Sequence, residues 1–113
     1  MIEQIILEYF ENLEGFAVPP YMMRPEVKPA EYIIIEKTGG SETNKIKAAN
    51  IAIQSYAPTL YEAAQLNETV KEAMANIITL PSISSCRLQN DYNFTNTATK
   101  QPRYQAVFIV TYY

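Results

Sequence analysis

Cys86 is the residue of this chain best suited by type to act as a nucleophile, and Arg87 beside it could lower the pKa of its thiol. The sequence has no His, which removes the commonest general base and the usual partner of a catalytic Ser or Cys. A single Cys also cannot form an internal disulfide or a zinc cluster. Since Ile83 and Leu88 are close by in the sequence, we expect Cys86 to be a core thiol on a strand.

The remaining chemical groups are carboxylates and one glycine-containing loop, and neither forms a recognisable catalytic or metal site. Asp91 is the only Asp, and the Glu residues fall on the outer faces of expected helices rather than in a converging pair. Gly39-Gly40-Ser41 lacks the Lys that follows in a phosphate-binding loop. We therefore expect no enzyme, no cofactor and no metal ion; an enzyme that uses a lone Glu is the weaker alternative.

The aromatic and sulfur-containing side chains favour interaction with other proteins. The sequence has nine Tyr and four Met and no Trp, and both Tyr and Met are enriched at interfaces. Tyr113 is an exposed aromatic candidate. Tyr residues also lie at the edges of hydrophobic cores with their hydroxyls in water. The nine Tyr residues therefore either bind other proteins or belong to the edge of the core, and both interpretations stay open.

Charge is unevenly distributed along the chain. The formal net charge is −3 without a concentration of basic residues, so we expect no specific binding of nucleic acid. The first predicted helix has an acidic face, which is either solvated or a partner surface, whereas the cations fall on strands and loops. A head-to-tail ring could pair the two surfaces. The predicted interface comprises Glu8, Glu11, Gly39, Gly40, Glu42, Lys45, Lys47, Asn93, Lys100, Arg103 and Tyr113.

Length and composition favour a single domain over residues 1–113. No apolar run approaches the roughly 18 residues of a membrane span, so we expect no membrane insertion. The first 23 residues contain no Lys or Arg and four Glu, which is unlike a secretory signal. The single Cys fits a reducing compartment.

The first third of the sequence predicts a helix, a proline-rich connection and a buried strand. The helix, Ile2–Leu13, has apolar residues at helical spacing and is followed by Gly15 in a left-handed cap. Dense prolines in the next segment allow only a short edge strand at Val18–Arg24. Three consecutive Ile then predict a buried strand at Glu31–Lys37.

A hairpin and a long helix follow. We expect Thr38–Asn44 to be a mobile loop whose Gly-Gly pair supplies positive φ, and too long to be a two-residue turn. The next strand is Lys45–Tyr56, with Ala49, Ile51 and Ile53 on one face and Ile46, Ala48, Ala52 and Tyr56 on the other. Because this alternation is imperfect, we expect either that both faces are partly covered or that a bulge lies near Ala48–Ala49. Thr59 and Glu62 form a capping box that begins a helix extending to about Thr79. Its predicted apolar stripe is Leu60, Ala63, Ala64, Val70, Met74, Ile77 and Ile78, with Asn67 among them.

The last third predicts two strands joined by a polar loop. The strands are Ser82–Asp91 and Arg103–Tyr113, and the loop is Tyr92–Gln101. The order α-β-β-β-α-β-β predicts an α+β fold with a four- to five-stranded mixed or antiparallel sheet and two helices on one face.

Three segments of the sequence resemble a known family: EYIIIEKTGGSETN, KIKAANIAIQSYAPTLYEAAQLNETVKEAM and SSCRLQNDYNFTNTATKQPRYQAVFIVTYY. They resemble the small tail proteins of siphophages and Gram-positive prophages, and most of all the tail terminator (tail-completion) proteins, similar to the minor tail protein U group of lambdoid phages. The resemblance extends over nearly the whole chain from Glu31 on.

The resemblance implies a protein that is structural rather than catalytic. Family members have helices on one side of a sheet and assemble as a hexameric ring on the head-proximal end of the tail tube. The ring stops tube polymerisation and offers a surface to the head connector, so the expected locations are the virion tail and, during assembly, the host bacterial cytoplasm. A head–tail joining protein of the same gene cassette and a non-catalytic ligand- or peptide-binding α+β module are the alternatives.

Overall fold

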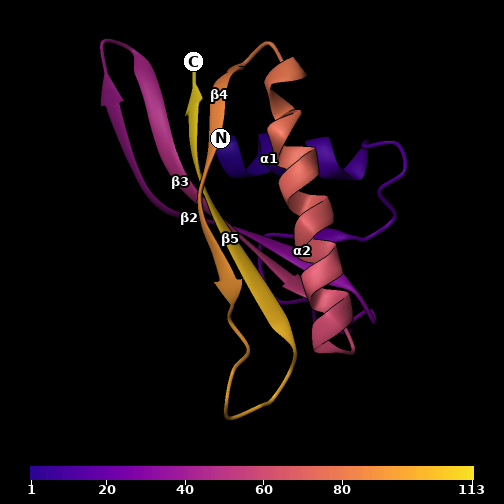
Figure 1. Ribbon diagram of the computed structural model, residues 1–113. Helices are drawn as coiled ribbons and strands as arrows, with labels where there is room; N and C mark the ends of the chain where they lie inside the picture. Colours follow the sequence, from indigo (N-terminus) through magenta and orange to yellow (C-terminus); the bar gives the residue numbers. More distant parts are fainter.

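The computed structural model describes residues 1–113 as two α-helices, one short 3₁₀-helix and five strands (Figure 1). Their order is the predicted α-β-β-β-α-β-β. In chain order the elements are α1 (Ile2–Glu11), β1 (Pro20–Tyr21), β2 (Tyr32–Thr43), β3 (Ile46–Tyr56), α2 (Leu60–Ala75), η1 (Ile77–Thr79), β4 (Ile83–Asn93) and β5 (Arg103–Tyr112).

The five strands form one mixed sheet in the order β1-β2-β3-β5-β4. All neighbouring strands are antiparallel except β1 and β2, which run parallel with Pro20 opposite Ile33. The two-residue β1 is the predicted edge strand, shorter than Val18–Arg24 because the proline-rich chain around it lacks amide donors. An α+β fold with a mixed sheet is confirmed.

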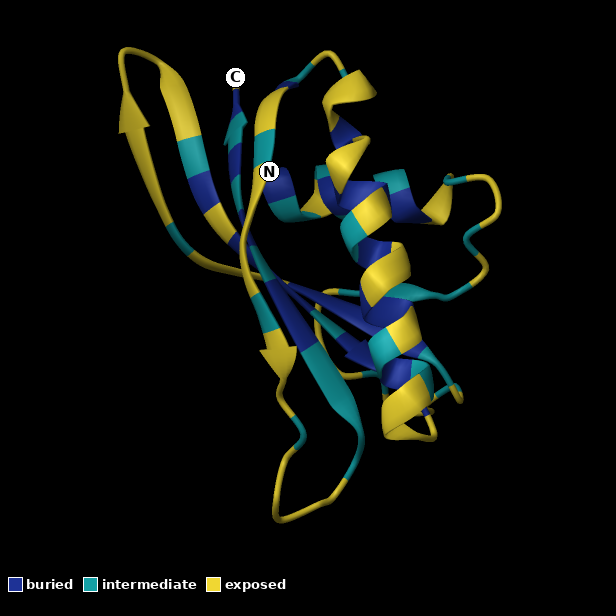
Figure 2. Cartoon of the chain, in the orientation of Figure 1, coloured by how far each residue is buried: buried dark blue, intermediate teal, exposed yellow.

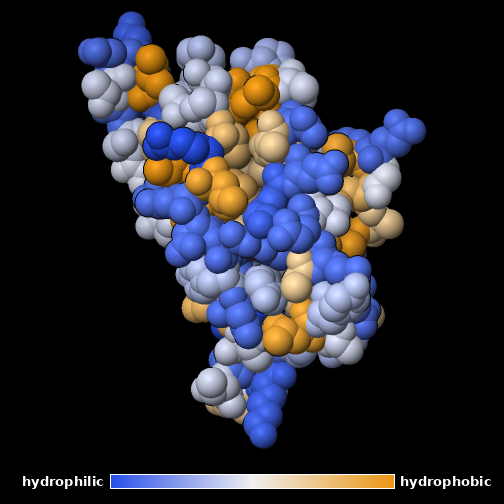
Figure 3. Space-filling model, in the orientation of Figure 1, coloured by the Kyte–Doolittle hydropathy of each residue, from blue (hydrophilic) through white to orange (hydrophobic).

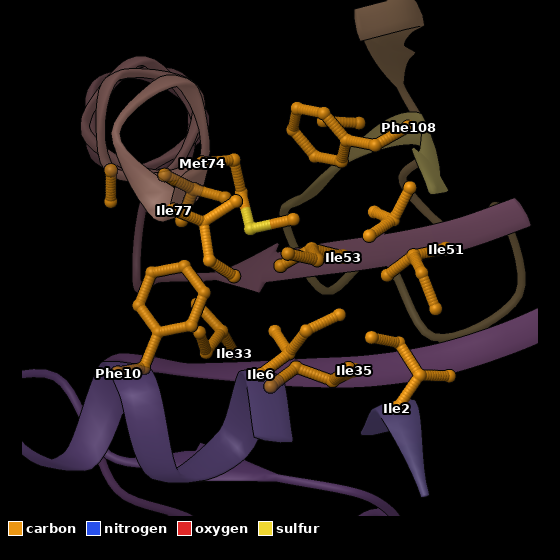
Figure 4. Close-up of a cluster of buried hydrophobic side chains, with 14 of the residues drawn as sticks. Ile2, Ile6, Phe10, Ile33, Ile35, Ile51, Ile53, Met74, Ile77 and Phe108 are labelled. Atoms are coloured by element: carbon orange, nitrogen blue, oxygen red, sulfur yellow. The ribbon is translucent and has the colours of Figure 1, made fainter. Parts of the chain in front are cut away.

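Both helices lie on the same face of the sheet and share one core. Apolar residues of α1 at three- to four-residue spacing, such as Ile6 and Phe10, meet Met74 of α2 over the inner faces of β2 and β3 (Figure 4). The other members of the core come from both α-helices, from η1 and from strands β2 to β5: Ile2, Ile33, Ile35, Ala49, Ile51, Ile53, Leu66, Val70, Ala73, Ile77, Ile83, Ala106, Phe108, Val110 and Tyr112. Ala49, Ile51 and Ile53, which the sequence predicts to share one face of the long strand, form the inner face of β3.

The start of α2 has the predicted cap in a modified form. The amide of Glu62 donates to Oγ1 of Thr59 at 3.1 Å, and the same hydroxyl donates to the Glu62 carboxylate at 3.0 Å. In the expected capping box the Thr59 amide would donate to the Glu62 carboxylate. Here the Thr59 hydroxyl is the donor instead.

The apolar stripe of α2 needs three corrections. Leu60 and Ile78 are exposed, whereas Leu66 is buried. The α-helix ends at Ala75, and the chain continues as the 3₁₀-helix η1. Because a 3₁₀-helix has three residues per turn, it rotates Ile78 away from the face that an uninterrupted α-helix would give it.

The predicted loop Thr38–Asn44 is wrong, because β2 continues through this segment to Thr43. A two-residue turn follows, in which Asn44 and Lys45 have φ of 52° and 66°. Gly39 and Gly40 do not have positive φ; they lie in the strand. A Cβ on Gly40 would lie 3.3 Å from the carbonyl oxygen of Ala48, so close cross-strand approach accounts for this glycine.

Three smaller features of the strands and of the end of α1 also differ from the predictions. The bulge lies in β2 between Lys37 and Gly39 rather than at Ala48–Ala49 of β3. Gly15 has the expected positive φ of 84°, in a turn beyond the end of α1 at Glu11. The β4–β5 loop begins after Asn93, since β4 ends two residues later than expected. No helix of the chain has both the length and the apolar character needed to cross a membrane.

Candidate functional site

The titratable groups singled out from the sequence do not come together in one cluster. Cys86 packs against the core as expected, and burial raises the pKa of its thiol to about 11. No group of three or more His, Cys, Asp or Glu side chains could hold a metal ion. The candidate residues instead occupy three surfaces: a hairpin arm, a loop at the opposite end of the sheet, and a groove beside α1.

The hairpin arm, defined here as residues 37–47, contains five of the predicted interface residues: Gly39, Gly40, Glu42, Lys45 and Lys47. It is almost entirely exposed and projects away from the helices (Figures 1 and 2). Glu42 lies directly opposite Lys47, and the Lys47 ammonium is 5.9 Å from the centre of the Tyr112 ring. Ile46, which is 45% exposed, lies between the two lysines. Figure 3 shows a hydrophobic patch beside hydrophilic atoms at the end of this arm.

Tyr113 follows the residue of β5 that pairs with the arm. Its backbone amide donates to the carbonyl of Ser82 at 3.1 Å, while its side chain is 66% exposed. Lys47 pairs with Tyr112 in the sheet, so the arm and the last residue of β5 share one end of the molecule.

The second surface is the loop of residues 94–102 together with its flanks, at the opposite end of the sheet (Figure 1). Arg103 organises it: Nε donates to the Phe94 carbonyl at 2.7 Å, Nη1 donates to the Tyr56 hydroxyl at 3.0 Å, and the guanidinium lies 4.3 Å from the Phe94 ring centre. Asn93 accepts from the Thr95 amide and hydroxyl. The Arg103 and Asn93 side chains therefore hold the loop in shape, and Lys100 is the exposed cation near its tip.

The third surface is a groove of about 450 Å³ between α1 and the link from η1 to β4. Its apolar lining includes Ile5, Leu13 and Leu80, and its carboxylates are Glu8 and Glu14. The other lining residues are Tyr9, Asn12, Pro81 and Ser82. Two acidic residues, Glu8 and Glu11, were predicted to belong to an interface, and only Glu8 lines the groove. Glu14, which was not among the predicted interface residues, also lines it. Helical spacing explains this, because residues 5, 8, 9 and 12 follow one side of α1.

A hydrogen-bonded aromatic network on the helix-free face was not foreseen. Tyr32 and Tyr56 stack with ring centres 4.5 Å apart. The Tyr56 hydroxyl donates to Gln54, Gln54 donates to Gln105, and Gln105 donates to the Tyr92 hydroxyl at 2.6 Å. The contacts of Tyr32, Tyr56 and Tyr92 link neighbouring strands of the sheet. For these three of the nine Tyr residues, they support a structural role rather than a role in binding a partner. Strand alternation places Gln54 and Tyr56 on the same face, and this was the available signal.

A second unforeseen cluster joins α2 to β4. Asn67 Nδ2 donates to the Asp91 carboxylate at 3.0 Å, and Lys71 Nζ donates to the same oxygen at 3.1 Å. A hydrogen bond to Glu68 is the largest cause of the raised pKa of Lys71, and Asp91 adds to it. The spacing of Asn67 and Lys71 by one helical turn was visible in the sequence, but their common partner was not.

We compared the chain with models of known protein families and with curated proteins, and neither comparison finds a match.

Proposed function

We propose that this protein is a tail terminator of a siphophage or prophage, a structural protein without catalytic activity. The observation that carries this proposal is the placement of two projecting segments, the hairpin arm and the loop 94–102, at opposite ends of one continuous sheet. A terminator contacts the tail tube on one side and the head connector on the other, so it needs two separate surfaces on a rigid body. The sequence resemblance from Glu31 on supports the same assignment.

In this proposal six copies form a ring on the head-proximal end of the tube. The partners are the tail tube protein and head connector proteins. The net charge of −3 suits a ring through which DNA must pass without being retained, because like charges repel. The protein acts in the virion tail after assembly in the bacterial cytoplasm.

Deletion of the gene in the phage tests the proposal. We expect tails of uncontrolled length, with or without heads, under the electron microscope, and recovery on complementation with the wild-type gene. Complementation with Glu72→Ala, on the exposed face of α2, is the matched control and should also restore normal particles. Normal virions from the deletion would contradict the assignment. Tails of normal length without heads would favour a head–tail joining protein instead.

The groove beside α1 favours a second candidate, a monomeric module that binds a peptide. Its apolar lining and two carboxylates could take a segment with an apolar and a basic residue. Light scattering during size-exclusion chromatography, with and without tail tubes, separates the two. A protein that stays monomeric and does not bind tubes would favour the peptide-binding module.

A further inference from the structure

We propose that the groove beside α1 receives the hairpin tip of a second copy of this chain, with Ile46 against the apolar lining and Lys45 and Lys47 facing Glu8 and Glu14. This contact rests on the proposed ring and identifies which surfaces of neighbouring subunits meet in it. It is an arm-to-groove contact between different surfaces of two identical chains.

The two surfaces are complementary in chemistry. The groove joins an apolar lining with two carboxylates, and the tip joins one exposed apolar side chain with two ammonium groups. Neither Lys45 nor Lys47 forms an ion pair within its own chain, where both ion pairs involve Lys71. The Glu8 carboxylate accepts one hydrogen bond, from Gln4 at 3.2 Å, and the Glu14 side chain forms no hydrogen bond or ion pair. Both sets of charges are thus available to a partner.

The turn itself provides an independent observation. A two-residue turn with positive φ at both positions favours Asn followed by Gly, and the chain has Asn44 followed by Lys45. A Lys with φ of 66° is in a left-handed conformation that Gly adopts freely, and Asn or Asp at small cost, but that strains other side chains. The fold alone would be better served by Gly at this position. A contact that needs the ammonium group at the tip accounts for Lys45.

The positions of the arm and the groove suit a head-to-tail contact. In the sheet, Lys47 of β3 pairs with Tyr112 of β5, and Tyr112 pairs with Ile83 of β4. Ser82, the residue before Ile83, lines the groove. The arm and the link from η1 to β4, which forms one wall of the groove, therefore lie at the same end of the sheet on opposite sides of β5 (Figure 1). Each copy can give its arm on one side and receive an arm on the other, and such contacts close into a ring when the rotation permits.

Site-specific disulfide formation between copies tests the contact. Two proteins are made in a Cys86→Ser background, one with Thr43→Cys at the tip, which keeps Lys45, Ile46 and Lys47, and one with Ser82→Cys in the groove, and mixed under mild oxidation. Mass spectrometry then measures the heterodimer, which only an intermolecular bond can form. The control mixture replaces the tip variant by Lys100→Cys, an exposed cation of the opposite loop. We expect the tip–groove heterodimer to form roughly tenfold faster than the control, because docking raises the effective concentration.

Charge reversal provides a second measurement that keeps the same two cross-linking positions, Thr43 and Ser82. Lys47→Glu in the tip protein, or Glu8→Lys with Glu14→Lys in the groove protein, should each remove the rate advantage, and combining the two should restore part of it. Equal rates for tip and control mixtures would overturn the contact. A rate advantage that charge reversal leaves unchanged would also overturn the proposal, because the lysines of the tip would then not face Glu8 and Glu14.

The outcome is separable from that of the proposed function. Tails of uncontrolled length in the gene deletion, together with an absence of tip–groove cross-links, would leave the terminator assignment standing and overturn this contact. Cross-linked rings from a protein whose gene deletion leaves virions normal would do the reverse.

Discussion

The phenol hydroxyl of Tyr9 on α1 donates a hydrogen bond of 2.7 Å to the carbonyl oxygen of Ala73 on α2. This bond joins the two helices, which cover different strands of the sheet. Tyr9 also lines the groove beside α1. The wall of the groove is thereby attached to the core. Burial raises the pKa of the Tyr9 hydroxyl, and the charge of a nearby Cys86 thiolate would raise it further.

Replacement of Tyr9 by Phe should lower the free energy of unfolding by about 1 kcal/mol, the usual net contribution of one hydrogen bond. The loss stays moderate because the Ala73 carbonyl keeps its bond from the Asn76 amide at 3.1 Å. Urea unfolding measures the difference. Tyr61→Phe is the matched control: its side chain is 72% exposed, so we expect less than about 0.5 kcal/mol. Equal losses would contradict a specific helix-to-helix bond.

Cys86 should react slowly with alkylating reagents in the folded protein. Burial raises its pKa from 9.0 to about 11, so the reactive thiolate is about 100-fold rarer below pH 9 than in the unfolded chain. Iodoacetamide labelling at pH 8, with and without urea, measures the ratio. Similar rates in both conditions would show that the thiol is exposed.

The same shift predicts how stability depends on pH. Because the folded pKa lies above the unfolded one, the contribution of the protonated Cys86 thiol is complete below pH 9 and is lost as pH rises through about 11. The raised pKa of Tyr9 acts in the same direction. Cys86→Ser should therefore reduce, without abolishing, the alkaline loss of stability in urea titrations between pH 8 and pH 11. An unchanged alkaline loss in this variant would exclude Cys86 as a cause.

Met74→Asp should unfold the domain. The Met74 side chain is completely buried between α2 and the sheet, and an aspartate there would be an unpaired charge in the core. Glu72→Ala, two residues earlier and exposed, should remain within about 0.5 kcal/mol of wild type. Circular dichroism melts measure both, and equal melts would contradict the orientation of α2.

Periodicity and capping determine how much of this fold can be predicted from the sequence. The helical stripe of α1 and the Thr59 cap of α2 depend on residues within a few positions of one another, so local patterns identified both. The alternation of β3 likewise identified Ala49, Ile51 and Ile53 as the inner face. These local signals were enough to predict the element order and the two-layer arrangement.

The remaining features depend on contacts between distant residues or on an unusual turn. Gly39 and Gly40 have the composition of a turn but lie in a strand, while the true turn contains no Gly. The Tyr32–Tyr56 stack requires the β2–β3 register, which follows from that turn. The groove beside α1 likewise needs the link from η1 to β4, some 70 residues later in the chain, and no local pattern predicts its position.

Replacement of Lys45 by Gly separates the needs of the fold from those of the proposed contact. Left-handed backbone costs a residue other than Gly about 1–2 kcal/mol, and the greater freedom of Gly in the unfolded chain offsets part of the gain. We expect a net stabilisation of about 0.5–1 kcal/mol in urea unfolding. Asn44→Gly is the control, because Asn already tolerates positive φ and Lys45 is retained; its stability should change less.

The same replacement should weaken association between copies, because it removes one of the two ammonium groups at the tip. The association is measured with the Thr43→Cys probe, in the same Cys86→Ser background with Ser82→Cys as partner. Lys45→Gly should slow this cross-link, whereas Asn44→Gly should not. A variant that becomes more stable and loses association would show that Lys45 serves the contact at the expense of the turn. A variant that becomes less stable would mean that the Lys45 side chain supports the hairpin itself, and the argument from turn strain would then be wrong.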